Sequence, residues 1–186
     1  KREGVDFILA VGGGSVIDSA KAIGMGVAEG GDVWDFYCNK RTPEKSLPVG
    51  VVLTVAAAGS EMSKSSVITN DEICIKCGRN AEISRPVFAI LNPELTVSVP
   101  KYPTACGCAD ILMHTLERYI AGGGSLKLTD SLAEALMTSV IASSKAVMKN
   151  LADYDARANL MGAGSLSHNG LMSGGGDGGD WCTHSL

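Results

Sequence analysis

The chain has 186 residues, of which 45% are apolar and 19% charged, with a net charge of −4 and a pI near 5.3. This composition is typical of a globular protein with a sizeable core and excludes disorder over most of the length. The 16 basic residues are scattered and no run of eighteen apolar residues occurs, so the sequence indicates no nucleic-acid surface, polybasic membrane patch or membrane span.

The first predicted element is a strand over residues 5–11, VDFILAV, an unbroken apolar run. The basic start and short apolar run also resemble a secretory signal, but glycines stand where a cleavage site would lie. A strand buried on both faces of a parallel sheet is therefore the better interpretation. The glycines at 12–14 lead into an amphipathic helix that Ser15 is expected to cap. Its predicted apolar stripe comprises Val16, Ile17, Ala20 and Ile23. Strand, glycine turn and helix predict half of a βαβ unit.

Two further strands are expected in the first hundred residues. Residues 47–54 predict a second buried strand, followed by a loop of small residues. Residues 86–97 predict a third strand, which Asn92 and Pro93 stop. The polar segment 65–85 between them is expected to hold a short hairpin or excursion.

Helical patterns replace strands after Pro100. The first predicted helix covers 103–120 and has Pro103 in its first turn, the second follows Thr129 as its N-cap, and the third begins at an Asp153 cap. We expect no further strand, and therefore an α/β region followed by an all-α region. The predicted domains are 1–100, a partial nucleotide-binding α/β domain, and 101–186, a partial helical domain.

The six cysteines leave two interpretations open. Cys74 and Cys77 form a C-x-x-C pair, and Cys106 and Cys108 form a C-x-C pair, which together could supply a zinc site. The segment between the pairs is long, however, and C-x-C suits a tetrahedral site less often than C-x-x-C. Free thiols in a reducing cytoplasm are the favoured alternative.

The segment Gly12-Gly13-Gly14-Ser15 is a candidate phosphate site. Glycines let the backbone approach an anion closely, and the free N–H groups and dipole of a helix N-terminus attract it. The spacing matches neither G-x-G-x-x-G nor a Walker motif, so a tight strand-to-helix turn without a ligand is the alternative.

Three side chains in the helical region are candidate metal ligands. Asp110 and His114 lie four residues apart, so both project from one face of a helix, where a carboxylate and an imidazole can share a divalent ion. His184 opens a further helical segment and can complete such a site. A surface Asp–His pair is the alternative, and His168 is interpreted as an ordinary core or surface histidine.

Together these segments resemble the iron-containing alcohol dehydrogenase family. The resemblance rests on ILAVGGGSVIDSAKAIG, LTVAAAGSEMSKSSVIT, RPVFAILNPELTVSVP and TACGCADILMHTLERYI, in the family's order, and it covers essentially the whole chain. SLSHNGLMSGGGDGGDWCTH looks most like the branch of butanol dehydrogenases and NADPH-dependent aldehyde reductases. The resemblance implies a Rossmann-like parallel sheet followed by a helical metal-binding domain, an arrangement similar to dehydroquinate synthase.

The resemblance also implies roles for single residues. Its nucleotide-contacting positions correspond to Gly13, Gly14, Ser15, Asp18, Thr54, Ser60 and Lys76. Asp110, His114 and His184 correspond to three of the family's four metal ligands. The fourth is a histidine beyond the third, and the sequence stops first, so we expect a chain truncated at both ends. Ala58 replaces a usual threonine near the cofactor, and Asn92 replaces a usual aspartate.

The implied function is hydride transfer between a nicotinamide, NAD(H) or NADP(H), and a metal-bound alcohol or aldehyde. Iron(II) is the favoured metal and zinc the alternative. The resemblance also implies a small-molecule substrate. The cysteines favour a cytoplasmic protein, and the composition indicates no nucleic-acid or membrane partner. The sequence leaves the oligomeric state open, although the sheet edge exposed by the missing first strands suits a homodimer. The competing hypothesis is an inactive fragment that keeps a nucleotide-binding turn or serves as an interaction module. A related metal-dependent polyol dehydrogenase is a third interpretation.

Overall fold

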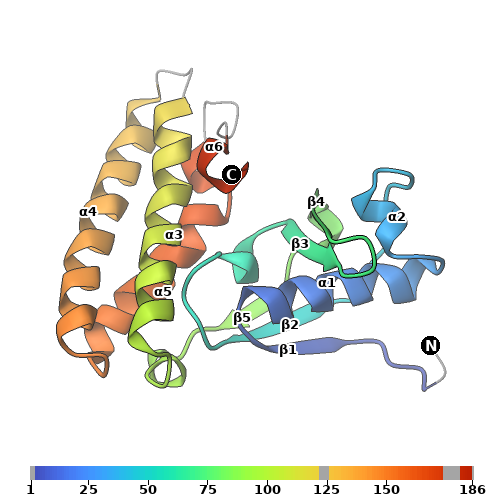
Figure 1. The fold of residues 1–186 in the computed structure, drawn as a ribbon, viewed down its shortest axis with the longest axis horizontal. Coiled ribbons are helices and arrows are strands. Elements are labelled where there is room, and N and C mark those ends of the chain that lie inside the picture. Colours follow the sequence, from blue (N-terminus) through green and yellow to red (C-terminus); the bar gives the residue numbers. More distant parts are fainter. Residues whose placement is uncertain (1–2, 122–125, 174–180, 186) are drawn as a thin grey trace. The chain divides into compact units, whose positions relative to one another are not determined.

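The computed structural model describes residues 3–121, 126–173 and 181–185. The chain divides into two compact units, shown with their elements in Figure 1. The first unit comprises Lys1–Leu53 and Ser60–Ile90, and the second comprises Thr54–Gly59 and Leu91–Leu186. The predicted domains 1–100 and 101–186 stay predictions.

The first unit contains a parallel three-stranded sheet. Its order is β1-β2-β5, formed by β1 (Ile8–Gly12), β2 (Val49–Leu53) and β5 (Phe88–Ile90). Helix α1 (Gly14–Glu29) follows β1 and packs against β1 and β2, so the predicted βαβ unit is confirmed. The predicted burial of the first strand on both faces was wrong, because Leu9 and Val11 on one face of β1 are exposed. Gly12 pairs with Leu53, and both strands therefore end at the same edge of the sheet. A short helix, α2 (Trp34–Tyr37), lies between α1 and β2.

An antiparallel hairpin occupies the polar segment between β2 and β5, as predicted. It consists of β3 (Ser65–Asn70) and β4 (Ile75–Asn80), flanked by the 3-10 turns η1 (Ser60–Met62) and η2 (Glu82–Ser84). Strand β3 packs against α1.

The predicted details of α1 were partly wrong. Gly13, not Ser15, is the N-cap, and Ser15 lies inside the first turn. Val16 and Ile23 are exposed, whereas Lys21, which was left out of the apolar stripe, is fully buried. The buried face follows Ile17, Ala20, Lys21, Ala22, Gly24 and Met25. Hydropathy could not predict this face because a lysine lies at its centre.

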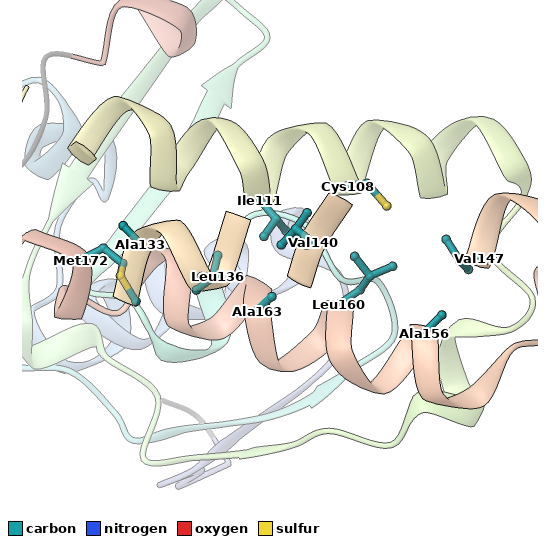
Figure 2. Packing of buried hydrophobic residues seen from close by; sticks show 10 residues of the cluster. All are labelled: Cys108, Ile111, Ala133, Leu136, Val140, Val147, Ala156, Leu160, Ala163 and Met172. Carbon is teal, nitrogen blue, oxygen red and sulfur yellow. The ribbon is translucent and has the colours of Figure 1, made fainter. Parts of the chain in front are cut away.

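The second unit is built from three long helices. They are α3 (Lys101–Ala121), α4 (Lys127–Lys149) and α5 (Tyr154–His168). Figure 2 shows the apolar cluster between them: Cys108, Ile111, Ala133, Leu136, Val140, Val147, Ala156, Leu160, Ala163 and Met172. The 3-10 turns η3 (Pro93–Thr96) and η4 (Leu171–Ser173) and the short helix α6 (Cys182–Ser185) complete the unit.

The helix caps of the second unit gave one correct and one wrong prediction. The Asp153 side chain accepts a hydrogen bond from the Ala156 N–H at 3.0 Å and caps α5 as expected. Thr129 is not a cap, because the Leu126 carbonyl already accepts a hydrogen bond from the Thr129 N–H and the helix begins before it. None of the helices in the described part of the chain combines the length and apolar composition needed to cross a membrane.

The segment Thr54–Gly59 belongs to the second unit because it packs directly on α3 and α5. A Cβ atom at Gly107 of α3 would overlap the carbonyl oxygen of Ala56. A Cβ atom at Gly59, which has a φ of +64°, would lie 2.5 Å from the Gly164 carbonyl oxygen of α5. Glycine at both positions therefore permits a backbone-to-backbone approach that any larger residue would prevent.

Candidate metal centre and nucleotide-binding turn

Helix α3 and the short helix α6 bring the three predicted metal ligands together. The ligand atoms of Asp110, His114 and His184 all lie within 4.8 Å of one another. The Nε2 atom of His184 is 3.4 Å from Oδ1 of Asp110, and Nδ1 of His114 is 4.0 Å from the same oxygen. The rings of His114 and His184 are stacked, with centroids 4.4 Å apart. Asp110 and His114 share a helix face because they are four residues apart.

His114 has an incomplete hydrogen-bond set. Its side chain is 6% exposed, and its Nδ1 atom is buried without a hydrogen-bond partner among the described residues. Burial, followed by the neighbouring His168, His184 and Arg118, lowers the pKa of His114 to about 3. The ring is therefore neutral and offers a lone pair rather than a charge. A buried polar atom without a partner costs about 1–3 kcal/mol, so this nitrogen marks a place for a ligand.

The spacing of the three donors fits a divalent cation. With metal–ligand bonds of about 2.0–2.2 Å, the donors of a tetrahedral site lie roughly 3.4 Å apart. The separations of Asp110 Oδ1 from His184 Nε2 and from His114 Nδ1, 3.4 and 4.0 Å, are close to this value. One carboxylate oxygen with two imidazole nitrogens is a donor set that suits iron and zinc. The residues present therefore fit a metal ion.

Glu117 is a residue of this site that the sequence analysis missed. It lies on α3 three residues after His114, and its side chain is 6% exposed. One carboxylate oxygen accepts a hydrogen bond from the Thr183 N–H at 2.6 Å, and the other lies 2.5 Å from Nδ1 of His184. Burial alone would raise the pKa of Glu117, but the hydrogen bonds from Thr183 and His184 outweigh it and lower the pKa. Its place seven residues after Asp110, on the same helix face, was the available signal.

His168 lies beside the candidate ligands but is engaged elsewhere. Its ring centroid is 4.4 Å from that of His114, and its Nδ1 atom is 3.1 Å from the Arg118 guanidinium. A guanidinium can only donate, so Nδ1 accepts and the ring proton is assigned to Nε2. Arg118 also lies over the Trp181 ring at 4.3 Å and donates a hydrogen bond to the His114 carbonyl.

The two cysteine pairs of the alternative zinc site belong to different units. Cys74 and Cys77 lie in the first unit and Cys106 and Cys108 in the second, and none of the four forms a disulfide, so the zinc alternative stays a prediction. Among the described residues, Asp110, His114 and His184 form the one group of three or more potential ligands close enough to share a cation.

The glycine turn of the first unit starts a 16-residue helix. The Gly13 carbonyl accepts hydrogen bonds from the Val16 and Ile17 N–H groups, and the first turn of α1 carries no acidic residue. Ser15 is exposed there. This is an arrangement of N–H groups and dipole that attracts a phosphate, and the phosphate-binding role of Gly13, Gly14 and Ser15 stays a prediction.

The predicted cofactor residues Asp18 and Ser60 are hydrogen-bonded to each other, and Asp18 is also hydrogen-bonded to Val67 of the same unit. Ser60 donates to one Asp18 oxygen at 2.6 Å, and the Val67 N–H donates to the other at 2.9 Å. Burial raises the pKa of Asp18, against the opposing effect of these two hydrogen bonds. Lys76 is exposed on β4, and Thr54 belongs to the second unit, so the structure does not join the predicted cofactor residues into one described site.

Lys21 is the centre of this network and was also missed. Its ammonium lies 2.7–2.9 Å from four oxygens: the Ser60 carbonyl and hydroxyl, the Ser63 carbonyl and the Ser65 carbonyl. Burial lowers the pKa of Lys21 to about 8, although Asp18 and Glu61 oppose the shift. The lysine fastens the loop before β3 onto α1.

Comparison with known proteins agrees with the expected resemblance. Residues 1–93 match the family model described as iron-containing alcohol dehydrogenase, and residues 104–186 match the C-terminal region of the same family. The chain is 43% identical over 186 residues to NADH-dependent butanol dehydrogenase A of Clostridium acetobutylicum and 41% identical to the probable NADH-dependent butanol dehydrogenase 1 of Bacillus subtilis. These matches cover 100% of this chain and 48% of each relative, so the chain spans about half their length. The NADPH-dependent aldehyde reductase YqhD of Escherichia coli is 36% identical.

Solved structures give the same result. The crystal structure of NADH-dependent butanol dehydrogenase A from Thermotoga maritima superposes with a TM-score of 0.94 at 38% identity, over 97% of this chain and 45% of that one. The Escherichia coli YqhD structure gives a TM-score of 0.93 at 34% identity, over 98% of this chain and 47% of that one. The predicted fold class, a Rossmann-like parallel α/β region followed by a helical region, is confirmed.

Proposed function

The chain belongs to the iron-containing alcohol dehydrogenase family, and on that premise we propose that it acts as a metal-dependent alcohol dehydrogenase or aldehyde reductase. The reaction interconverts an alcohol and an aldehyde by hydride transfer with NAD(H) or NADP(H). Relatives named for NADH and for NADPH both support a nicotinamide cofactor and leave its phosphorylation open.

One observation carries this proposal. Asp110 and His184 are 74 residues apart in sequence and belong to different helices. The donor atoms of Asp110, His114 and His184 nevertheless lie within 4.8 Å of one another. The Nδ1 atom of His114 is buried without a hydrogen-bond partner among the described residues, as expected of a metal ligand when the metal is absent. We propose Fe²⁺ as the metal, with Zn²⁺ as the alternative, because the donor set suits both.

When bound, the cation supplies Lewis acidity toward the carbonyl or alkoxide oxygen, and the nicotinamide supplies or accepts the hydride. The protein residues hold these groups. Asp110 neutralises one positive charge of a divalent ion, whereas His114 adds a lone pair and no charge because its low pKa keeps it neutral. A divalent ion and these ligands by themselves would therefore keep net positive charge where the substrate oxygen becomes negative. Gly13, Gly14 and Ser15 are proposed to hold the cofactor phosphates at the N-terminus of α1. Asp18, Thr54, Ser60 and Lys76 remain proposed contacts.

The test is metal binding followed by turnover. Purified protein is freed of metal, titrated with Fe²⁺ without oxygen or with Zn²⁺, and then given butanal with NADH or NADPH while nicotinamide absorbance is followed. We expect one ion per chain and loss of both binding and turnover in Asp110→Asn. Asp155→Asn changes an exposed aspartate in the first turn of α5 and serves as the matched control. Wild-type protein that binds neither metal nor nucleotide would contradict the proposal.

The competing hypothesis of an inactive fragment or interaction module is not favoured. The three ligand positions and the glycine turn are all present, and the relatives are named as dehydrogenases and reductases. A polyol dehydrogenase is supported less well, because the three relatives described above are named for butanol or aldehydes.

We also propose a cytoplasmic location and a homodimer. The six cysteines form no disulfide with one another, which suits a reducing compartment. The apolar side chains of Leu9 and Val11 on β1 are 53% and 56% exposed, which would suit further contacts at this face of the sheet. Cell fractionation and light scattering test the two proposals separately.

A further inference from the structure

The buried Glu117 of α3 makes two hydrogen bonds to the short helix α6. The helix has only four residues, and so short a helix has little stability of its own in water. Both carboxylate oxygens of the buried Glu117 are directed at it: one accepts from the Thr183 N–H at 2.6 Å, and the other meets Nδ1 of His184 at 2.5 Å. The position of His184 therefore depends on Glu117.

The contact with Glu117 also selects which nitrogen of His184 is free. An ionised carboxylate only accepts hydrogen bonds, so the proton of a neutral His184 ring lies on Nδ1. The lone pair is then on Nε2, the atom that lies 3.4 Å from Asp110 Oδ1 in the ligand group. A histidine with the opposite tautomer would present an N–H to the cation and could not bind it.

We propose that Glu117 is a positioning residue of the metal centre, which fixes both the orientation and the tautomer of His184 so that its Nε2 atom faces Asp110 and His114. The proposal rests on the metal site proposed above. A carboxylate, a histidine and a metal in series are a general way to orient a ligand and increase its basicity. Both carboxylate oxygens of Glu117 are used: Oε1 accepts from the Thr183 N–H, and Oε2 contacts Nδ1 of His184.

Glu117→Gln is the sharpest variant because it keeps size and shape. With its amide oxygen on the Thr183 N–H, the glutamine places its NH₂ group against Nδ1 of His184. Two donors cannot face each other, so the ring must accept at Nδ1 and move its proton to Nε2. The matched control is Glu134→Gln on α4, where the exposed carboxylate accepts a hydrogen bond from the Tyr119 hydroxyl at 2.8 Å.

Two measurements on the full chain test the proposal. Long-range ¹H–¹⁵N spectra of the metal-free protein report the tautomer: we expect Nδ1–H for His184 in the wild type and in Glu134→Gln. Zn²⁺ affinity, measured by competition with a chromophoric chelator, should fall about 10–100-fold in Glu117→Gln and stay unchanged in Glu134→Gln. Co²⁺ absorption should show an altered coordination geometry in Glu117→Gln alone.

The outcomes separate this proposal from the proposed function. If wild-type protein binds neither Zn²⁺ nor Co²⁺, the metal site fails and the proposal for Glu117 fails with it. If the wild type binds Zn²⁺ and Glu117→Gln binds equally well, the metal site stands and only the role of Glu117 is overturned. If Glu117→Gln does not fold, the wild-type spectrum still decides, because an Nε2–H tautomer of His184 would overturn the proposal.

Discussion

Each compact unit buries several ionisable side chains, and one from each unit, Lys21 and His114, have opposite environments. In the first unit, Lys21 is fully buried and its ammonium faces four oxygens within 2.9 Å. In the second unit, His114 is equally well shielded, yet its Nδ1 atom has no hydrogen-bond partner among the described residues. One group has more acceptors than it has protons, and the other has a lone pair that the surrounding protein does not use.

This difference separates a structural role from a binding role. A buried charge with a full set of partners stabilises the fold only as a complete network, and removing the charge leaves the partners unpaired. A buried polar atom without a partner destabilises the free protein, and it is retained where a ligand completes it. Lys21 is therefore expected to matter for folding and His114 for binding.

The largest expected effect is on folding. Lys21→Met should lower the free energy of unfolding by about 3–5 kcal/mol, because four oxygens of the loop before β3 lose their buried cation. Urea denaturation measures the change. Lys40→Met, which removes an exposed ammonium beside Asp35, is the control and should change stability by less than about 0.5 kcal/mol. A loss below about 1 kcal/mol for Lys21→Met would remove the contrast between the two units.

The second effect is on binding. His114→Leu should weaken Zn²⁺ binding on the order of 100-fold. A structural zinc site with four ligands gains about 10–16 kcal/mol, so each ligand contributes roughly 3 kcal/mol, which corresponds to a change in affinity of about 100-fold. The free protein should be as stable as the wild type or slightly more stable, because the variant removes an unsatisfied buried atom. Chelator competition and urea denaturation of the same samples report both quantities. A large loss of stability without a loss of affinity would reverse the assigned roles.

The third effect is a pH dependence of stability that belongs to Lys21. Its folded-state pKa is about 8, below the 10.5 of an unfolded lysine, so the unfolded chain binds more protons between these values. The wild type should therefore gain stability relative to Lys21→Met as the pH rises from about 8 to 10.5, by an amount on the order of 1–3 kcal/mol. Denaturation curves of both proteins at several pH values test this. A constant difference would show that Lys21 titrates normally.

The smallest effect is expected at His168. His168→Gln should change Zn²⁺ affinity by less than about threefold, because its Nδ1 atom accepts from Arg118 and is not directed to a cation. The same chelator assay measures it beside His114→Leu. A tenfold loss would make His168 a ligand and would show that an occupied nitrogen does not exclude binding.

Much of the fold could be predicted from local patterns. The apolar run before the glycines, the Asn92-Pro93 stop and the Asp153 cap each act within a few residues, and each led to a correct element. The proximity of Asp110, His114 and His184 was predictable because Asp110 and His114 are four residues apart on one helix and the family resemblance supplied His184. Thr129 failed as a cap because an earlier carbonyl already began the helix.

Lys21 and Glu117 could not be predicted in the same way. Lysine and glutamate are mostly exposed, so a sequence pattern places them in solvent by default. Their partners lie 39–44 and 66–67 residues away, and only the folded chain brings them together. Both were missed because tertiary hydrogen bonds, rather than hydropathy, bury them.

The segment Thr54–Gly59 has a consequence for how such proteins can recombine. It lies within the range of the first family match, residues 1–93, but packs on Gly107 and Gly164 in the range of the second, residues 104–186. A chimera that exchanged the two regions between homologues would inherit this segment from one parent and its packing surface from the other. A glycine at 107 from one parent must therefore meet a loop from the other parent whose backbone follows the same path as Thr54–Gly59.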